Sequence, residues 1–448
     1  MSNVANIVLA GVSYPAKDSK ANRVFDTVND VIEAINNTNM RTGEYVRTLG
    51  YYAKGDGGGG YYTIVDTDGD INAGNLMLKV NIINYINVKM FGAKGDGISD
   101  DTSVIQKLLN TFIGTPILLP IGTYIISSTI RIPSNSYIIG SGLDSVIKAS
   151  DEFNGDLLCS ANYGSEGELY DYNIRLYNFT VDGGFADYKN YYVKKQNSTG
   201  TGYSHKGNSF ELDKMVIRNC GGNGVTLTDN VNRPLSDYTN AGTSYIINSK
   251  IMYNGRNGLE NNGCVDFVIH NCDIHSNSRY ASKAGNNMKF NSGNAKISDT
   301  HLFSLYGPVK PYASIFVATS SGSIQFSNCH IEGAFIPAVI YGNRCFFENT
   351  RFYSAFGECD LRIDCEYTSF VNCEFFKQAN DAIPAEKGEW ISAVIFEKNT
   401  DNLKNQGLSF INCSLQQCKF TNATVNLGYK NRIELSGNGE VGAVDYSK

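Results

Sequence analysis

Apolar and polar positions from about residue 174 onward follow a short pattern that recurs many times. Each copy has apolar residues, an asparagine, often a cysteine, and then apolar residues again, as in "FVIHNCDI" and "LSFINCSL". Most copies are separated by 21 to 29 residues, which is the length of one coil of a parallel β-helix. The polar position is occupied in turn by Asn178, Asn219, Asn248, Asn271, Asp299, Asn328, Asn349, Asn372 and Asn412.

The asparagine of each copy predicts a tight bend between two short strands. An asparagine tolerates left-handed backbone geometry, and its side chain can bond to the equivalent side chain of the next coil. We therefore expect the nine positions to stack in one column. The cysteines that follow are predicted to be buried thiols, not disulfides or metal ligands; they are Cys220, Cys272, Cys329, Cys373 and Cys413.

A second family of strands lies between these copies and alternates apolar and polar residues with a period of two. Examples are "GVTLTD", "NMKFNS", "DLRIDC" and "AVIFEK". The residues predicted to point inward are Val225, Leu227, Met288, Phe290, Leu361, Ile363, Val394 and Phe396. The residues predicted to point outward include Glu260, Lys289, Asn291, Arg362 and Asp364. A shift of one residue would reverse the two sets.

The first 85 residues differ from this repeat. Residues 24–41 have the apolar spacing of a helix, and two aromatic strand candidates, residues 46–52 and 61–65, flank a run of four glycines. We predict an N-terminal segment with a helix (residues 1–44), a small β domain (45–85) and a parallel β-helix (86–448). The predicted fold class is therefore all-β, a single-stranded solenoid.

The glycine-rich stretch "FGAKGDGISDDTSVIQKLLN" connects the small domain to the repeats. A phosphate loop is excluded because Ile98 stands where the phosphate-binding lysine would be. The spacing of the aspartates does not fit a calcium-binding EF-hand loop. We expect a glycine turn, then Asp100 or Asp101 as the cap of a helix over residues 102–109. Such a helix would cover the open end of the β-helix.

Composition and charge exclude several classes of function. The net charge is −6, and no block of Lys or Arg occurs, so we expect neither a nucleic-acid nor a membrane partner. The first residues lack the basic and apolar regions of a secretory signal peptide. Cys272 and His275 form a CxxH pair with no second pair, and His270 and His275 should lie on different walls. The sequence therefore predicts no metal site and no cofactor.

Two stretches carry a resemblance to a known family. The glycine-rich stretch, followed by "ILLPIGTYIISSTIRIPSNSYIIGSG", resembles the opening of pectate-lyase-superfamily β-helix proteins, in particular bacteriophage tailspikes and capsule depolymerases. The segment "GEYVRTLGYYAKGDGGGGYYTIV" resembles the small domain that precedes the β-helix in many phage tail proteins. The resemblance implies a right-handed β-helix, often a homotrimer, that binds or cleaves a bacterial surface glycan. It also implies a virion location, with the N-terminus contacting other tail or baseplate proteins.

The chemistry of glycan cleavage selects candidate residues on the predicted outward face. Glycoside hydrolysis needs two carboxylates about 5 to 9.5 Å apart, whereas elimination needs a base and a cation that stabilises a uronate. The candidate catalytic residues are Glu260, Asp229 and Asp364. The candidate substrate-binding residues are Arg256, Lys289, Asn291, Arg362, Asp182, Tyr203 and His205.

The sequence leaves three hypotheses open. The chain is a tail-associated depolymerase of a polysaccharide or teichoic acid, a non-catalytic receptor-binding tail protein, or a bacterial polysaccharide lyase or hydrolase. Fold alone does not choose among them, because function depends on the site. An acid pair in a groove would favour the depolymerase, whereas a groove of aromatic rings and amides would favour the receptor-binding protein. A trimer would weigh against the bacterial lyase or hydrolase.

Overall fold

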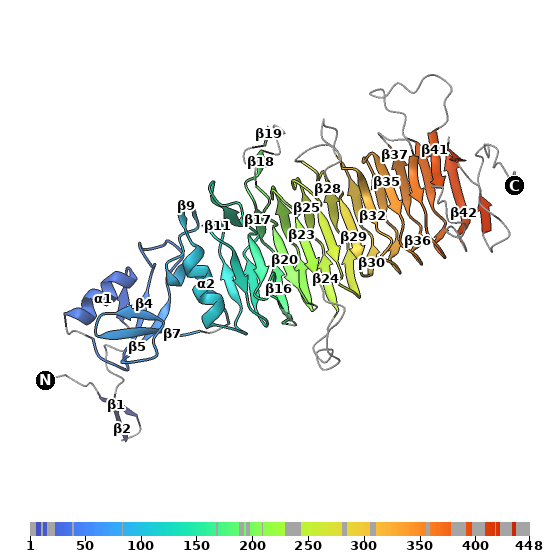
Figure 1. Cartoon of the computed structure of the whole chain (residues 1–448). Helices are drawn as coiled ribbons and strands as arrows, with labels where there is room; N and C mark the ends of the chain where they lie inside the picture. The colour runs from blue at the N-terminus through green and yellow to red at the C-terminus, as the bar shows by residue number, and fades with distance from the viewer. Residues whose placement is uncertain are drawn as a thin grey trace.

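The chain forms a long shaft of stacked strands with a small α/β unit at its N-terminal end (Figure 1). The computed structural model describes residues 6–9, 12–15, 23–37, 40–82, 84–166, 169–187, 192–193, 198–207, 209–228, 243–279, 285–304, 311–354, 359–377, 391–396, 408–416, 418–421 and 432–435. No helix within these ranges has the length and apolar character that spanning a bilayer would need.

The N-terminal unit combines one helix with a five-stranded sheet. The strand order is β3 (Arg23–Phe25), β4 (Tyr45–Thr48), β5 (Tyr61–Val65), β7 (Leu76–Val80) and β6 (Ile71–Ala73). Helix α1 (Val28–Asn36) begins with a capping box in which Thr27 and Asp30 bond each other's backbone N–H, and it buries Val28, Val31 and Ile35. Before it, β1 (Asn6–Leu9) and β2 (Val12–Pro15) form an antiparallel hairpin.

The structure places the expected helix and the expected small β domain in one unit. Helix α1 contacts β3, β4 and β6, and β3 pairs with β4. The predicted boundary at residue 44 therefore falls inside this unit, because β3 lies N-terminal to the helix and completes the sheet.

The glycine-rich stretch forms the junction between this unit and the shaft. A short 3-10 helix, η1 (Val88–Phe91), is followed by a loop whose backbone N–H groups at Lys94 and Gly95 donate to Asp101, at 2.7 and 3.0 Å. Asp101 thus holds the preceding loop and does not cap the helix with its side chain, while Asp100 accepts from the N–H of Thr102 at 2.9 Å. Burial raises the pKa of the Asp101 carboxyl. Helix α2 (Thr102–Thr111) buries its apolar face against η1, β11 (Gly122–Ile126) and β12 (Ile130–Ile132) at the open end of the shaft.

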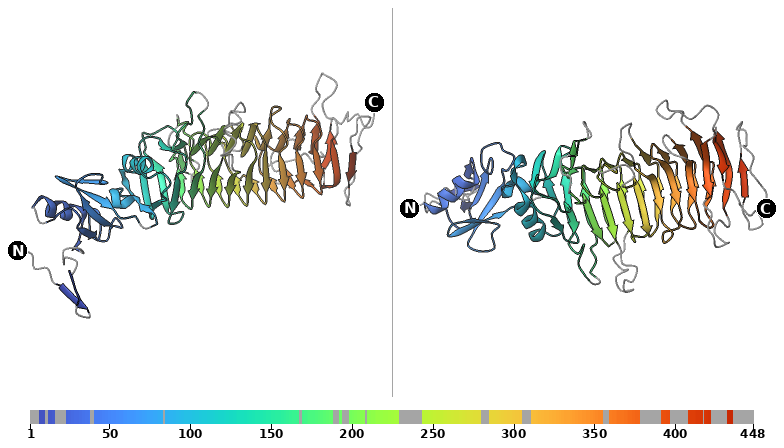
Figure 2. Two further views of the ribbon diagram at one scale, coloured as in Figure 1. Left: turned by 90° about the horizontal axis from the view of Figure 1, so that it is seen from below. Right: turned by 45° about the horizontal axis from the view of Figure 1, so that its top comes forward.

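The shaft is a parallel β-helix with three walls, which confirms the predicted fold class (Figure 2). Walls A and B belong to one 24-stranded sheet, and wall C is a separate 11-stranded sheet. Within each wall, every strand pairs in parallel with the equivalent strand of the next coil, as β24 (Ser244–Ile247) does with β27 (Phe267–His270). Neighbouring coils are therefore separated by about 4.8 Å.

The strand bounds follow the three walls. Wall A contains β8 (Ile86–Asn87), β10 (Ile117–Leu119), β13 (Tyr137–Gly140), β16 (Ile174–Tyr177), β21 (Phe210–Asp213), β24 (Ser244–Ile247), β27 (Phe267–His270), β30 (Ala295–Ser298), β33 (Gln325–Ser327), β36 (Phe346–Glu348), β39 (Ser369–Val371), β42 (Ser409–Gln416) and β44 (Arg432–Leu435). Wall B contains β9 (Asp96–Asp100), β11 (Gly122–Ile126), β14 (Ser145–Ala149), β17 (Thr180–Asp182), β22 (Val216–Arg218), β25 (Lys250–Met252), β28 (Asp273–His275), β31 (His301–Phe303), β34 (His330–Glu332), β37 (Arg351–Ser354), β40 (Glu374–Lys377) and the second half of β42. Wall C contains β12 (Ile130–Ile132), β15 (Leu158–Ser160), β20 (Tyr203–Lys206), β23 (Val225–Thr228), β26 (Leu259–Asn262), β29 (Met288–Ser292), β32 (Ala313–Val317), β35 (Ile336–Ile340), β38 (Cys359–Ile363), β41 (Ile391–Phe396) and β43 (Cys418–Thr421). The hairpin β18 (Ala186–Asp187) and β19 (Tyr192–Val193) projects from the shaft (Figure 1).

The bend between walls A and B carries the predicted asparagine column, with one correction. All nine predicted positions have positive φ, and eight of them stand at this bend. Asn219 instead follows β22, at the bend between walls B and C, and Lys214 (φ 54°) takes its expected place after β21. The side chains of the column bond from coil to coil, for example from Asn412 Nδ2 to Asn372 Oδ1 at 2.8 Å.

The interior confirms the predicted inward residues that the structure describes. Val225, Leu227, Met288, Phe290, Leu361 and Ile363 are all fully buried. Val394 and Phe396 lie in β41, but their side chains fall outside the described residues. Phe326, Phe347, Phe370 and Phe410 stack in one row with ring centroids 4.7 to 4.8 Å apart, which is the spacing of the coils. Cys220, Cys272, Cys329, Cys373 and Cys413 are buried, free thiols.

Candidate functional site

Glu260 lies on the outer face of wall C, inside a cage of hydrogen-bond donors. Its Oε2 accepts from the amides of Asn223, at 2.7 Å, and Asn257, at 3.0 Å. Its Oε1 accepts from Asn291 Nδ2 at 2.7 Å and lies 3.6 Å from Lys289 Nζ. The Glu260 side chain is 19% exposed. The carboxylate is therefore fixed in orientation but still reaches solvent.

The strand register explains why these residues meet. Glu260 in β26 lies opposite Lys289 in β29, one coil further along, and Asn291 follows two residues later on the same outward face. Asn223 and Asn257 occupy equivalent turns before β23 and β26, where Asn257 Nδ2 donates to Asn223 Oδ1 at 3.1 Å. Of the predicted site residues, the structure thus brings Glu260, Lys289 and Asn291 together.

A second carboxylate on this face was missed in the sequence. Ser204 in β20 lies two coils before Glu260 in the same outward row, because Ser204 pairs with Thr226 and Thr226 with Glu260. Asp156 accepts from Ser204 Oγ at 2.9 Å and from the Thr201 N–H at 2.8 Å. Two coils correspond to roughly 10 Å. The carboxylate of Asp156 therefore lies on the same side of wall C as Glu260, with the buried residues Ser204 and Thr226 between them.

Tyr163 lies near Ser204, within range of the negative charges of both acids. Burial raises the pKa of its phenol, the nearby Ser204 hydroxyl opposes that rise, and the negative charges of Asp156 and Glu260 add to it. The phenol is consequently protonated at neutral pH, and it is half-buried. The arrangement places one proton donor beside two carboxylates, with an ammonium group on the far side of Glu260.

The other predicted acids do not join this group. Arg362 lies in β38 and Asp364 directly follows that strand. Arg362 is four coils from Glu260 in the same row, through Lys289, Phe316 and Val339. Four coils correspond to roughly 19 Å, so Asp364 and Arg362 form a second cluster, separate from Glu260, and a catalytic role of Asp364 stays a prediction. Asp229 lies outside the described residues.

Tyr203 and His205 were predicted to bind substrate, but both are fully buried in the core. They lie opposite Val225 and Leu227, which point inward, and Tyr203 Oη lies 2.9 Å from His205 Nδ1. Burial raises the pKa of Tyr203 well above its usual value. These two residues cannot contact a ligand on the outer face.

Asp182 and Arg256 were also predicted to bind substrate. Asp182 ends β17 on wall B, where its carboxylate forms a 2.8 Å ion pair with Arg218 Nε and accepts from the N–H of Gly184. These bonds give Asp182 a structural role at a bend. Arg256 is exposed in the turn before β26, and Lys289, not Arg256, forms the ion pair with Glu260.

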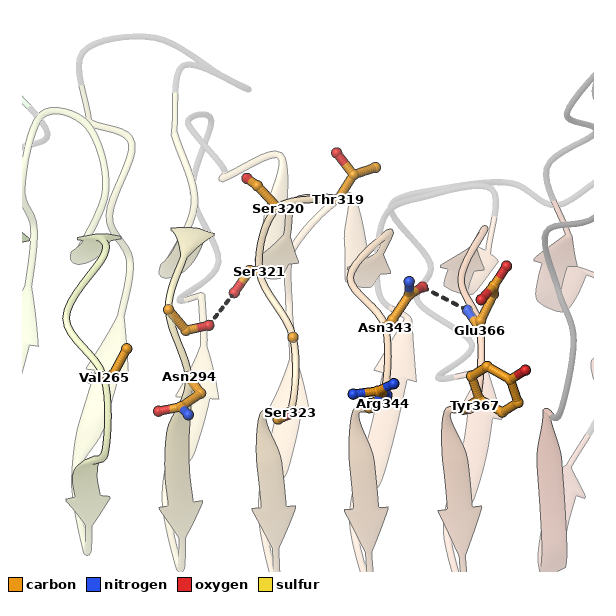
Figure 3. Close-up of a pocket in the computed structure, with 12 residues that line it drawn as sticks. Val265, Asn294, Thr319, Ser320, Ser321, Ser323, Asn343, Arg344, Glu366 and Tyr367 are labelled. Carbon is orange, nitrogen blue, oxygen red and sulfur yellow. Dashed lines mark hydrogen bonds between the residues drawn. The ribbon is translucent and has the colours of Figure 1, made fainter. Parts of the chain in front are cut away.

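Two further features continue the polar face along the shaft. Beyond Lys289, the outer face carries three partly exposed aromatic rings, Tyr312, Phe316 and Tyr341, which contact one another. At the adjoining bend between walls C and A, a cavity of about 440 Å³ is lined by amides, hydroxyls and one charged residue of each sign. In Figure 3, Arg344 and Tyr367 lie on neighbouring coils, and Asn343 accepts from the N–H of Glu366 at 2.8 Å. Aromatic rings and planar polar groups are the surfaces to which sugars bind.

Comparisons with known proteins agree with this architecture. Residues 85–302 match the family described as rhamnogalacturonase A/epimerase, pectate lyase-like. The pre-neck appendage protein of Bacillus phage B103 is 27% identical over 203 residues, which are 42% of this chain and 23% of the relative. The mannuronan C5-epimerase AlgE5 of Azotobacter vinelandii is 36% identical over 110 residues, 22% of this chain and 11% of the relative. The chain thus spans less than a quarter of the length of these relatives.

The same fold occurs in a solved phage structure. The tailspike protein gp49 of the Acinetobacter baumannii bacteriophage Fri1, a capsular polysaccharide depolymerase, superposes with a TM-score of 0.61 at 13% identity, over 94% of this chain and 75% of its own. At this identity the likeness shows the fold alone. Together with the family match, it confirms the resemblance to pectate-lyase-like β-helix proteins and to phage tailspikes.

Proposed function

We propose that this chain is part of a phage tail appendage that binds a bacterial surface polysaccharide along wall C and cleaves it. The observation that carries the proposal is the outward carboxylate of Glu260, held by three amides and Lys289, with Asp156 and Tyr163 on the same face. The phage appendage and tailspike relatives and the glycan-modifying epimerase support the class of protein. They also support the expected location in a virion that acts at the bacterial surface.

The geometry suits acid–base chemistry on a bound sugar. Every described contact of Glu260 donates a hydrogen bond or a positive charge to its carboxylate, so Glu260 serves as the base or nucleophile. Tyr163 keeps its proton at neutral pH and serves as the acid that protonates the leaving oxygen. Lys289 lies beside Glu260, where it neutralises a carboxylate of an acidic sugar.

Asp156 gives the hydrolytic version of this chemistry its second carboxylate. Inverting glycosidases separate their two carboxyl groups by about 6.5 to 9.5 Å to leave room for a water molecule. Asp156 stands three coils before Glu260 at the backbone, roughly 14 Å, but its carboxylate bonds to Ser204, which is only two coils away. The hydrolytic version therefore requires both side chains to lean toward each other along the shaft. Elimination would instead use Glu260, Tyr163 and Lys289 without Asp156.

The test is incubation of the chain with purified capsular polymers and wall teichoic acids. New reducing ends without ultraviolet absorbance indicate hydrolysis, and absorbance of an unsaturated product indicates elimination. Glu260→Gln should abolish either product while the melting temperature stays close to that of the native chain. Glu211→Gln is the matched control, because Glu211 is an acid on wall A that pairs with Arg175 at 3.8 Å. If Glu260→Gln retains full activity, this site is not the catalytic one.

A non-catalytic receptor-binding role is the second candidate, and the amide-rich surroundings of Glu260 favour it. Asn223, Asn257 and Asn291 are the type of side chain that binds sugar hydroxyls. In that case an affinity gel that carries the chain retains the polymer, and no cleavage product is released. Asn291→Leu should then weaken retention, because it removes one amide and adds an apolar group to the face.

The homotrimer and the contact of the N-terminal unit with other tail proteins belong to the same proposal. Sedimentation equilibrium of the full chain distinguishes a trimer from a monomer. Removal of residues before the β-helix should leave polymer binding intact while abolishing incorporation into particles.

A further inference from the structure

Three side chains on the outer face of wall B converge on one point. His301 in β31 and His330 in β34 lie opposite each other on neighbouring coils, and Glu332 follows His330 by two residues on the same face. His301 Nε2 lies 3.3 Å from Glu332 Oε1, and His330 Nε2 lies 3.5 Å from Glu332 Oε2. One possible ligand atom from each of the three residues lies within 4.8 Å of the other two.

These separations are those of ligands around a single ion. Two ligand atoms that are each about 2.1 Å from a tetrahedral zinc ion lie roughly 3.4 Å apart. The two nitrogen-to-oxygen distances, 3.3 Å to Oε1 and 3.5 Å to Oε2 of Glu332, are close to that value, and one ligand nitrogen of each histidine lies within 4.8 Å of the other. A small shift of the side chains would therefore place all three atoms at bonding distance from one metal ion.

Aromatic contacts also hold the two imidazole rings in this arrangement. The His301 and His330 rings stack at 4.7 Å with an interplanar angle of 10°, and Phe303 stacks on the other face of His301 at 4.2 Å. The Tyr353 ring meets the edge of His330 at 4.8 Å. His330 Nε2 is buried and makes no hydrogen bond among the described residues.

We propose that His301, His330 and Glu332 form a binding site for a divalent transition-metal ion, Zn²⁺ in the first place. Imidazole nitrogens select zinc, copper, iron or nickel, whereas calcium and magnesium require oxygen ligands. Two histidines and one glutamate leave at least one coordination position open. The side chain of His301 is 36% exposed and that of Glu332 is 29% exposed. The open coordination position therefore faces solvent, where it accepts water or an oxygen atom of a ligand.

The test uses the full chain after removal of metals by a chelator. Titration with Zn²⁺ in a calorimeter should show one equivalent bound, and Co²⁺ should give the visible absorption of a tetrahedral complex. His330→Gln and Glu332→Gln should each weaken binding at least tenfold, because each removes one of three ligands. Thermal unfolding of each variant checks that the fold persists.

His270→Gln is the matched control. His270 on wall A also faces a carboxylate, with Nδ1 3.3 Å from Asp299 Oδ2, but no second histidine belongs to this pair. Binding in this variant should equal that of the native chain. Absence of stoichiometric Co²⁺ absorption, or binding that survives His330→Gln, overturns the proposal and leaves the three residues as an ion-paired surface cluster.

Discussion

Asn271 Nδ2 donates a hydrogen bond to Asn248 Oδ1, 2.9 Å away in the preceding coil. Both residues have positive φ, 52° and 51°, at the bend between walls A and B. One side chain therefore performs two tasks, since it tolerates the left-handed backbone and links one coil to the next. Substitutions can separate these two tasks.

Asn271→Gly should destabilise the chain only slightly, and Asn271→Val considerably more. Glycine adopts the left-handed conformation freely and loses only an exposed hydrogen bond, about 0.5 kcal/mol. Valine loses the bond and also strains the backbone, by roughly 1 to 2 kcal/mol. Urea unfolding followed by circular dichroism measures both values. Equal losses for the two variants would show that backbone strain at this bend is unimportant.

Phe370 occupies the middle of the phenylalanine row, with Phe347 at 4.8 Å and Phe410 at 4.7 Å. Its side chain is fully buried, so Phe370→Ala should cost about 3 to 5 kcal/mol of unfolding free energy. Phe346→Ala is the control, because Phe346 lies one coil earlier on the same wall and is 38% exposed. A similar melting temperature for the two variants would show that the buried phenylalanine row does not contribute more to stability than an exposed ring.

The fold was predictable because its signal repeats. Every repeat predicts the same coil three times, through its asparagine, its buried cysteine and its alternating strand. An error at a single position therefore does not change the predicted architecture. Asn219 shows the limit of this reasoning. "MVIRNCGG" has the same residues as the true column, but another left-handed bend, between walls B and C, accepts asparagine equally well. Lys214 has no sequence feature that marks it as the column residue.

The site was less predictable because it depends on register and on distant coils. Glu260, Lys289 and Asn291 followed from alternation within strands, which period-two patterning reveals. Tyr203 and His205 were predicted to bind substrate, but they belong to β20, and both side chains are buried on its inward face. Asp156 lies before a long insertion and is 104 residues from Glu260 in the chain, so only the stacking of β15, β20, β23 and β26 brings the two acids to one face.

Tyr163→Phe should lower kcat on the cleaved polymer by about 10²- to 10⁴-fold, because the variant removes the proton donor. The ring remains, so KM should change little. Steady-state rates with the polymer that passes the cleavage test measure both constants. Tyr172→Phe serves as the control, since Tyr172 is an exposed tyrosine outside the site. A rise in KM with unchanged kcat would assign Tyr163 to sugar binding instead of proton transfer.

Cys272 should resist alkylation in the folded chain. Burial raises the pKa of its thiol to about 12, so the reactive thiolate is on the order of 10⁻⁴ of the population at pH 8. Iodoacetamide labelling mapped by mass spectrometry should find Cys272 unmodified in the native chain and fully modified in urea. Rapid labelling without denaturant would show that the coil opens locally at this position.

His275 should make the shaft less stable as the pH falls from 6.5 toward 4. Burial lowers the pKa of this imidazole from 6.5 to about 4, with Asp273 opposing the shift and Lys250 and His301 adding to it. Between these two values the unfolded chain binds a proton that the folded chain does not, so stability is complete above pH 6.5 and declines below it. The loss approaches roughly 3 kcal/mol at pH 4.

The measurement is the melting temperature between pH 7 and pH 4.5, in the presence of a chelator, for the native chain and for His275→Phe. Phenylalanine retains the stacking on Phe303, whose ring lies 4.2 Å from that of His275, but it cannot bind a proton. The variant should therefore lose less stability than the native chain over this interval. Parallel curves for the two proteins would mean that His275 takes up its proton without destabilising the coil. Other carboxylates and histidines would then cause the loss of stability at low pH.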